Sequence, residues 1–173
     1  MKKIEEKDFH QSQRGYFAGC LYNEMSINPN IFLLTGDLGF GMLDKIRDDF
    51  PRRFINCGAS EQAMMGLGVG LALEGKIPFI YSITTFLLYR PFETIRTYID
   101  HEIIPVKLVG SGRDKDYSHD STSHWSEDAK PILDCLPNIV QFWPEEKEEI
   151  QKVVKEMIKN KKPSFISLKR QWH

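Results

Sequence analysis

Two histidines and an aspartate stand close together in a polar stretch near the middle of the chain. His119, Asp120 and His124 lie in GSGRDKDYSHDSTSHWSE, between Gly110 and Glu127. Imidazole titrates near neutral pH, so these side chains suit hydrogen bonding to a substrate or proton transfer. A metal site is disfavoured, because ligands at this spacing usually stand on a helix or a tight knuckle, and no further ligand is near. We expect substrate contact, with an ordinary mobile surface loop as the alternative.

A second candidate is Glu61, which begins the otherwise small and apolar stretch EQAMMGLGVGLALEG. Burial disfavours the ionised form of a carboxyl group, whereas a helix N-terminus favours it. The position suits a catalytic carboxyl group, and it equally suits an ordinary glutamate at the start of a helix.

Glycines form two further patterns. Gly66, Gly68 and Gly70 lie inside a helical stretch and not in a strand-to-helix turn, which argues against a dinucleotide-binding fingerprint and favours close contact with another helix, within the chain or across a subunit interface. The turn from Gly36 to Gly41 follows a strand, where its three glycines either contact a ligand or only shape the loop.

Three aromatic residues, Phe86, Tyr89 and Phe92, recur at spacings that place them near one face of a helix. Core packing would explain this pattern. They also follow a predicted strand, and the carboxyl end of a parallel strand is where a planar ligand docks in sheets of this kind.

Short apolar runs alternate with helical stretches along the chain. We predict strands at Ile31 to Thr35, Phe54 to Cys57, Pro78 to Ile83, Val106 to Val109, Ile139 to Phe142 and Phe165 to Leu168, and helices over residues 8–26, 42–49, 60–74, 86–101, 127–135 and 145–160. We expect Ser60 to cap the third helix, and Pro144 to open the last one. Nearly all-apolar strands indicate a sheet covered on both faces. The predicted fold is α/β, a three-layer, doubly wound, mainly parallel six-stranded sheet with helices on both faces.

Composition excludes several classes of protein. The 173 residues are 41% hydrophobic and 27% charged, and for this length and composition we expect one domain over residues 1–173. The net charge of −1 shows no basic excess, so we expect no binding to nucleic acid. The three cysteines show no CxxC spacing, which argues against a disulfide framework and a zinc site. The charged N-terminus and the lack of a long apolar run predict a cytoplasmic protein that does not enter a membrane.

In their order along the chain, several tracts together resemble the pyrimidine-binding (Pyr) domain of transketolase-like, thiamine-diphosphate-dependent enzymes. The tracts are TGDLG, FINCGASEQAMMGLGVGLALEGKIPFIYSITTF, RPFETIR, HDSTSHWSED, LPNIVQFWPEE and SLKRQ, which cover nearly the whole length. The resemblance implies that Glu61 contacts the aminopyrimidine of thiamine diphosphate and activates the cofactor. It further implies that Phe86, Tyr89 and Phe92 form an aromatic pocket for that ring, with Tyr89 as its stacking partner. Asp37 and Leu38 are implied to make other contacts with the cofactor.

The same resemblance implies residues for the substrate. Asp120 and His124 are similar to a pair that touches sugar hydroxyls, and His124 is a second catalytic candidate. Arg170 and Arg14 are similar to arginines that bind a substrate phosphate. The family usually has a histidine near Gly112, which this chain lacks, and His119 is a candidate to replace it.

The family's diphosphate-binding (PP) domain holds Mg²⁺ through a GDG…N motif that is missing here, and the chain stops three residues after Arg170. We therefore expect a split enzyme, in which a separate PP subunit holds Mg²⁺ and two copies of each chain form an α2β2 assembly. The expected reaction is two-carbon ketol transfer between phosphorylated sugars. Two alternatives stay open: a subunit of a 2-oxo-acid decarboxylase, dehydrogenase E1 or synthase enzyme, and a non-catalytic relative that oligomerises through the glycine-rich helix.

Overall fold

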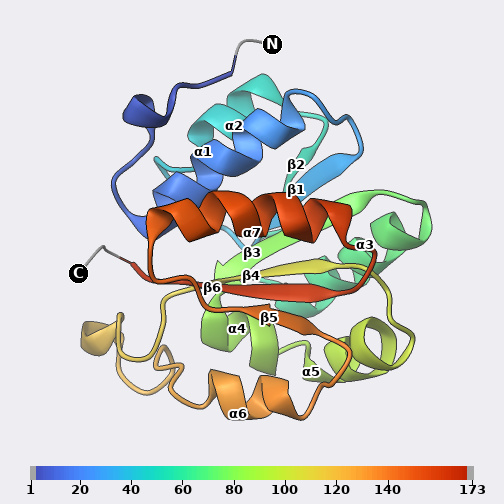
Figure 1. Cartoon of the computed structure of the whole chain (residues 1–173). Helices are drawn as coiled ribbons and strands as arrows, with labels where there is room; N and C mark the ends of the chain where they lie inside the picture. Colours follow the sequence, from blue (N-terminus) through green and yellow to red (C-terminus); the bar gives the residue numbers. More distant parts are fainter. Residues whose placement is uncertain (1–2, 171–173) are drawn as a thin grey trace.

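A computed structural model describes residues 3–170 of the chain. Its centre is a sheet in the order β2-β1-β3-β4-β6-β5, in which every neighbouring pair of strands is parallel (Figure 1). The strands are β1 (Ile31–Thr35), β2 (Phe54–Asn56), β3 (Ile77–Ile83), β4 (Lys107–Ser111), β5 (Val140–Phe142) and β6 (Ser164–Leu168). The sequence-based fold class is confirmed, and the sheet is entirely parallel.

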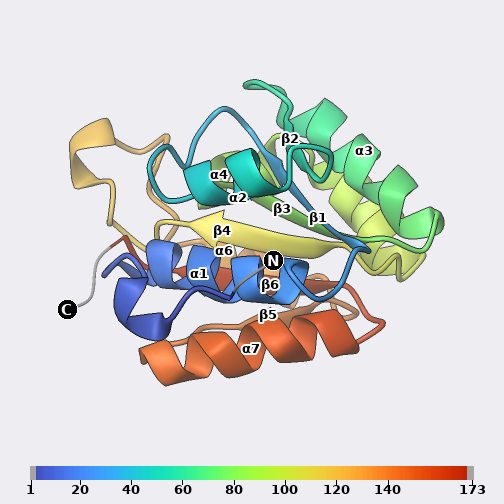
Figure 2. The same ribbon diagram turned by 90° about the horizontal axis from the view of Figure 1, so that it is seen from above.

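Helices cover both faces of this sheet (Figures 1 and 2). One face carries α1 (Gln13–Met25), α2 (Asp44–Asp49) and α7 (Lys147–Lys159), and the other carries α3 (Glu61–Leu73), α4 (Thr84–Tyr89), α5 (Phe92–Thr94), the π-helix η2 (Ile95–His101) and α6 (Ala129–Asp134). Two short 3₁₀-helices, η1 (Glu6–Asp8) and η3 (Ser118–Asp120), lie in loops. Successive residues of a strand point to opposite faces, so Phe79 and Tyr81 enter one core and Ile80 the other.

The parallel arrangement decides where polar side chains gather. All strands run the same way, so the loops that leave their carboxyl ends meet at one edge of the sheet. Figure 2 shows the arrow of β4 pointing into the long loop that follows it. The segments after β1, β2, β3, β4 and β6 therefore converge, although they are far apart in sequence.

Several predicted helix boundaries were wrong. The single helix expected over 86–101 is three pieces, because Pro91 interrupts the chain between α4 and α5. The first helix begins at Gln13, where Ser12 accepts a hydrogen bond from the Gly15 amide, and not at residue 8.

Both expected helix starts also need correction. Ser60 precedes α3 but makes no capping bond, since its hydroxyl donates to the Cys57 carbonyl at 2.7 Å. Helix α7 begins after Glu146, which forms a capping box with Glu149, and not at Pro144.

The glycines of α3 do not all serve the same purpose. A Cβ on Gly68 would lie 2.3 Å from Cδ1 of Ile80, so this glycine lets the helix approach β3 closely. At Gly66 and Gly70 an added Cβ would meet nothing in the described chain within 4 Å. Gly66 and Gly70 therefore contact no other helix within residues 3–170. Helix α3 presents an exposed face of small and apolar residues, made up of Ala63, Gly66, Leu67, Gly70 and Leu73.

A buried lysine ties the sheet to the end of α7. Lys107 is 1% exposed, and its ammonium group donates to the carbonyls of Asn160 at 2.7 Å and Lys162 at 2.6 Å. The first of these carbonyls belongs to the C-cap of α7, where unpaired carbonyl groups attract a cation. Burial lowers the pKa of Lys107 to about 8.

This shift predicts a pH dependence of stability. A lysine of the unfolded chain titrates near pH ~10.4, so between pH about 8 and about 10.4 the unfolded chain binds more protons than the folded one. The contribution of Lys107 to the free energy of unfolding therefore rises with pH across this window. Urea titrations of the wild type and Lys107→Met should give a stability difference that shifts in favour of the wild type as pH rises. A constant difference would contradict the assignment.

No helix within residues 3–170 is both long enough and apolar enough to cross a membrane.

Candidate active site

Glu61 lies at the carboxyl edge of the sheet, at the first position of α3. It is 2% exposed, although it carries a carboxyl group. Its Oε2 accepts a hydrogen bond from Nη1 of Arg90 at 2.7 Å, and its Oε1 accepts one from the Ser82 hydroxyl at 3.4 Å. Gly36 lies alongside, where an added Cβ would be 3.4 Å from Oε1. Burial with two polar partners distinguishes Glu61 from an ordinary exposed glutamate at a helix start.

Arg90 links Glu61 to the first of the predicted aromatic residues. Its guanidinium carbon lies 3.8 Å from the centre of the Phe86 ring, in a cation–π arrangement. Arg90 follows α4 directly and precedes Pro91, so it stands at the break in the helix. Its side chain is 46% exposed, and so the link that Arg90 forms between Glu61 and Phe86 is open to solvent on one side.

Residues of the loop after β4 extend this series of contacts beyond Phe86. The ring of His124 meets Phe86 edge-on at 4.8 Å between centroids, and Tyr117 lies 5.8 Å from His124. Nδ1 of His124 is 2.9 Å from the Ser123 hydroxyl. Helix α4, which carries Phe86, is further joined to this loop by the Thr85 hydroxyl, which donates to the Ser123 carbonyl at 2.7 Å.

Both predicted phosphate-binding arginines contact Tyr117. Nη1 of Arg14 donates to the Tyr117 hydroxyl at 3.0 Å and to the Ser111 hydroxyl at 3.4 Å, and the Arg170 guanidinium lies 5.4 Å from the centre of the Tyr117 ring. A continuous series of side chains thus crosses the carboxyl edge of the sheet, with Arg14 attached beside Tyr117. We call this series the site row: Glu61, Arg90, Phe86, His124, Tyr117 and Arg170.

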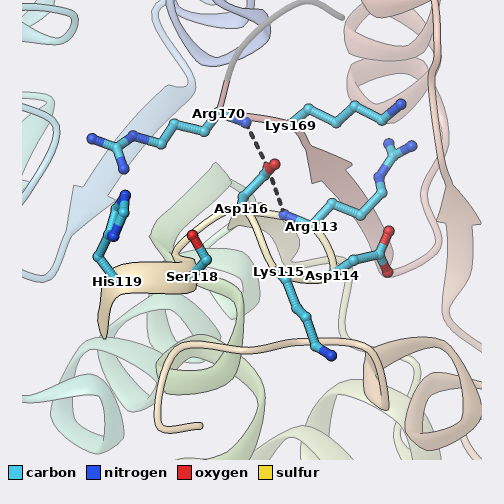
Figure 3. Close-up of a pocket in the computed structure, with 8 residues that line it drawn as sticks. All are labelled: Arg113, Asp114, Lys115, Asp116, Ser118, His119, Lys169 and Arg170. Carbon is cyan, nitrogen blue, oxygen red and sulfur yellow. Dashed lines mark hydrogen bonds between the residues drawn. The ribbon is translucent and has the colours of Figure 1, made fainter. Parts of the chain in front are cut away.

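A pocket of about 510 Å³ lies at the Arg170 end of the site row. Its lining residues are Arg113, Asp114, Lys115, Asp116, Ser118, His119, Lys169 and Arg170. Figure 3 shows the Arg170 and His119 side chains on one side of the Asp116 carboxylate, and those of Arg113 and Lys169 on the other. Oδ2 of Asp116 accepts hydrogen bonds from the backbone amides of Arg113 and Arg170, at 2.9 and 2.7 Å. The cationic lining suits an anionic group.

Comparison with known families gives a match over most of the chain. Residues 10–172 match the model of the transketolase pyrimidine-binding domain. The chain belongs to the transketolase pyrimidine-binding family.

Curated relatives of this transketolase-type chain include separate subunits. It is 30% identical over 142 residues to a putative transketolase C-terminal section of Methanocaldococcus jannaschii, covering 82% of this chain and 45% of that protein. It is 29% identical to an apulose-4-phosphate transketolase subunit of Actinobacillus succinogenes, covering 69% and 39%. A 1-deoxy-D-xylulose-5-phosphate synthase of Gloeothece citriformis is also 29% identical, over 80% of this chain and 22% of its own length. The chain thus spans about half or less of these relatives.

Solved structures show the same fold. A split-gene transketolase, described as an inactive β4 tetramer, matches with a TM-score of 0.82 and 29% identity, over 92% of this chain and 52% of that one. The transketolase of Campylobacter jejuni matches with a TM-score of 0.85, over 98% of this chain and 27% of that one. At 19% identity, this second match supports the fold alone.

The remaining predicted cofactor residues of this transketolase-type domain lie outside the site row. The Tyr89 hydroxyl donates to Asp128, and Tyr89 and Phe92 both pack against the core on the α3 side of the sheet. Asp37 and Asn56 exchange two hydrogen bonds, of 3.0 and 2.9 Å. Leu38 packs partly buried against the opposite core, with its carbonyl accepting from Thr35 at 2.9 Å.

Three of the predicted substrate residues are exposed, namely His119, Asp120 and Arg170. The Asp120 amide donates to the Tyr117 carbonyl at 3.0 Å, which closes the short helix η3. His119 lines the pocket beside Arg170, whereas Asp120 does not. His124 contacts Phe86 and does not line this pocket. Of the predicted substrate residues, Arg170 alone therefore belongs to both the pocket and the site row.

Sequence reasoning missed two members of the site row, Arg90 and Tyr117. Arg90 had a usable signal, since an arginine just before Pro91 and within a few residues of the aromatic positions is placed beside them. Tyr117 had no such signal, because its importance comes from contacts with residues on other elements. Its ring covers Gly112, where an added Cβ would lie 2.2 Å from Cε2 of Tyr117. The space beside Gly112 is therefore filled by Tyr117.

Replacing Gly112 with alanine should disturb this loop. Gly112 has a φ of +84°, which a residue with a side chain rarely adopts, and the new methyl group would overlap the Tyr117 ring. We expect a loss of about 1–3 kcal/mol in the free energy of unfolding. Urea denaturation measures this loss. Gly41→Ala is the control, because Gly41 has a similar φ of +79° but an added Cβ there would meet no atom within 4 Å, so this variant reports backbone strain without the clash. Equal losses for the two variants would show that Tyr117 does not constrain position 112.

Proposed function

We propose that this chain is the pyrimidine-binding subunit of a cytoplasmic, two-chain, thiamine-diphosphate-dependent transketolase. The observation that carries the proposal is Glu61, a buried carboxyl group at the start of α3, joined through the site row to a cationic pocket. In this reading Glu61 activates the cofactor, and the pocket receives the substrate.

The residues at the Glu61 end fit a planar ring with hydrogen-bonding nitrogens. Glu61 offers a buried acceptor, Gly36 leaves the space beside it free of a side chain, and Phe86 supplies an aromatic face nearby. Residues that would hold thiamine diphosphate are Asp37, Leu38, Glu61, Phe86, Tyr89 and Phe92. When bound, this group supplies the nucleophilic carbon and the electron sink for cleaving a bond next to a carbonyl.

Glu61 would act on a proton. A carboxyl group shielded from water holds or shares a proton with a ring nitrogen more effectively than an exposed one, since competing water is excluded. In the cofactor-free chain, Ser82 and Arg90 hold its two oxygens.

The other end of the site row suits a phosphorylated sugar. Arg170 and His119 extend toward the same side of the pocket (Figure 3), where a guanidinium group and an imidazole can both donate to phosphate oxygens. Asp120 and His124 are proposed to contact sugar hydroxyls, and Arg14, held by Tyr117, to support the phosphate end. His124 is also the proposed second catalytic residue.

Mg²⁺ is assigned to the partner. Among residues 3–170 there is no group of three or more histidine, cysteine, aspartate or glutamate side chains placed to hold a metal ion. Relatives named as a transketolase C-terminal section and as a transketolase subunit support a separate chain for the remaining functions. We propose that this PP subunit binds the cofactor diphosphate through Mg²⁺, and that the exposed face of α3 joins two copies of this chain in an α2β2 assembly.

Reconstitution tests the proposal. The chain is co-expressed with a candidate partner that carries a GDG…N motif, and the complex is assayed for ketol transfer from ketose phosphates to aldose phosphates. We expect activity only with both chains, thiamine diphosphate and Mg²⁺. The cofactor at 100-fold over its Kd should also stabilise the complex by about 2.7 kcal/mol. A complex that neither binds the cofactor nor turns over sugar phosphates would refute the proposal and favour a non-catalytic, oligomerising relative.

A second function rests on the synthase relatives. Four 1-deoxy-D-xylulose-5-phosphate synthases are between 29% and 31% identical to this chain. A complex that decarboxylates 2-oxo acids and ignores ketose phosphates would therefore place this subunit among the 2-oxo-acid enzymes, with the same role for Glu61.

A further inference from the structure

Arg90 occupies the space between the Glu61 carboxylate and the Phe86 ring. One guanidinium group makes both contacts, with Nη1 at 2.7 Å from Oε2 of Glu61 and its carbon at 3.8 Å from the ring centre of Phe86. A side chain that is 46% exposed has room to move outward. Glu61, by contrast, is enclosed and has little freedom to follow.

A guanidinium group and an aminopyrimidine ring have similar recognition chemistry. Both are planar, and both stack on aromatic faces. Both also present nitrogen to a carboxyl group, as N–H donors in the guanidinium and as a ring nitrogen that shares the carboxyl proton in the aminopyrimidine. A ring that hydrogen-bonds Glu61 and touches Phe86 needs the volume that the Arg90 guanidinium fills. The two groups cannot occupy it together.

We propose that Arg90 is a positioning residue that holds the place of the pyrimidine ring in the cofactor-free chain and leaves it when the ring binds. This inference rests on the proposed function. A buried carboxylate without a partner is strongly destabilising, and the Arg90 contact removes that cost while the cofactor is absent. The helix break at Pro91 lets Arg90 turn away, because the helical neighbours that would confine it are missing on one side.

The place-holding role predicts that the ring competes with Arg90. The full chain is titrated with 4-amino-5-hydroxymethyl-2-methylpyrimidine, and binding is followed by two-dimensional NMR. Arg90→Met leaves Glu61 and Phe86 in place but removes the competing group. We therefore expect this variant to bind the fragment about tenfold more tightly than the wild type does. Arg90→Lys, which pairs with a carboxylate but cannot lie flat on a ring, should fall between the two. The matched control is Arg96→Met, which removes an exposed arginine on η2 and should leave the affinity unchanged.

A second measurement needs no substitution of Arg90. In the wild type, the Nε–H resonance of Arg90 should move toward the position of a solvated arginine as the fragment is added, while that of Arg96 stays constant. A purely structural Arg90 would not respond in this way. This readout also decides the matter if Arg90→Met does not fold.

The possible results separate this inference from the proposed function. Equal or weaker fragment binding by Arg90→Met, or an unmoved Arg90 resonance at saturation, overturns the place-holding role. The reconstituted complex can still require Glu61 and thiamine diphosphate in that case, and the proposed function would stand. If Arg90→Met binds the fragment more tightly and the double variant Arg90→Met with Glu61→Gln does not, the place-holding role is supported. This holds even if the complex proves inactive on sugar phosphates.

Discussion

Glu61→Gln is expected to lower ketol transfer by the reconstituted complex about 10²- to 10⁴-fold, the range that a positioned acid–base group contributes. Glutamine keeps the size of the side chain and one oxygen, which can still accept from Arg90 or from Ser82, so the fold should survive. It cannot hold and release a proton, however. Steady-state rates at saturating cofactor measure the effect, and the melting temperature of the variant chain shows that it is folded.

Glu93→Gln is the matched control for this experiment. Glu93 lies on α5, close in sequence to Arg90, but its side chain is exposed. This substitution changes the same functional group and should leave the rate unaltered. Normal turnover by Glu61→Gln would contradict the cofactor role of Glu61, whereas equal losses in both variants would point to a general change of charge.

Arg113→Met is expected to be the most destabilising substitution in the pocket. Arg113 is 7% exposed, and Nη2 donates to the carbonyls of Pro144 at 2.9 Å and Ser167 at 2.7 Å. Nη1 also lies 2.5 Å from a carboxylate oxygen of Glu145. Methionine fills similar space but makes none of these hydrogen bonds and leaves Glu145 without its buried partner, so we expect a loss of about 2–4 kcal/mol.

Thermal unfolding measures this loss. For a chain of this size, about 3 kcal/mol corresponds to a fall in Tm of roughly 6–12 °C. Arg52→Met removes an exposed arginine and should change the Tm very little. The predicted fall in Tm would show that the Arg113 guanidinium stabilises the contact between β6 and the loop before α7. An unchanged Tm would contradict this structural role and favour a ligand-binding role for Arg113.

The sheet was accurately predicted from sequence because its strands are buried on both faces. Such strands form nearly continuous apolar runs, and each of the six was placed within two residues of its observed bounds. Helix ends were less predictable. Serine at position 60 is a favoured cap, yet its hydroxyl bonds backward to Cys57, a choice that depends on the path of the preceding loop.

The candidate site was predictable where residue type and strand order were sufficient. Glu61, Phe86, His124 and Arg170 follow different strands, and a parallel sheet must bring such residues to one edge. Arg90 and Tyr117 depended on side-chain packing across elements. Periodicity contains no information on which ring covers Gly112, or on which cation pairs with Glu61.

The site row lies at the carboxyl edge of the sheet, so attaching the protein to a surface through the opposite edge would not cover the site row. The turn before β6 carries two exposed lysines, Lys161 and Lys162, at the amino-terminal end of the strand whose far end leads to Arg170. Coupling confined to these two amines, and excluding the exposed Lys115 of the pocket lining, would anchor the protein to a sensor surface with its pocket facing the solution. The direction of the strands thus gives a simple rule for oriented immobilisation.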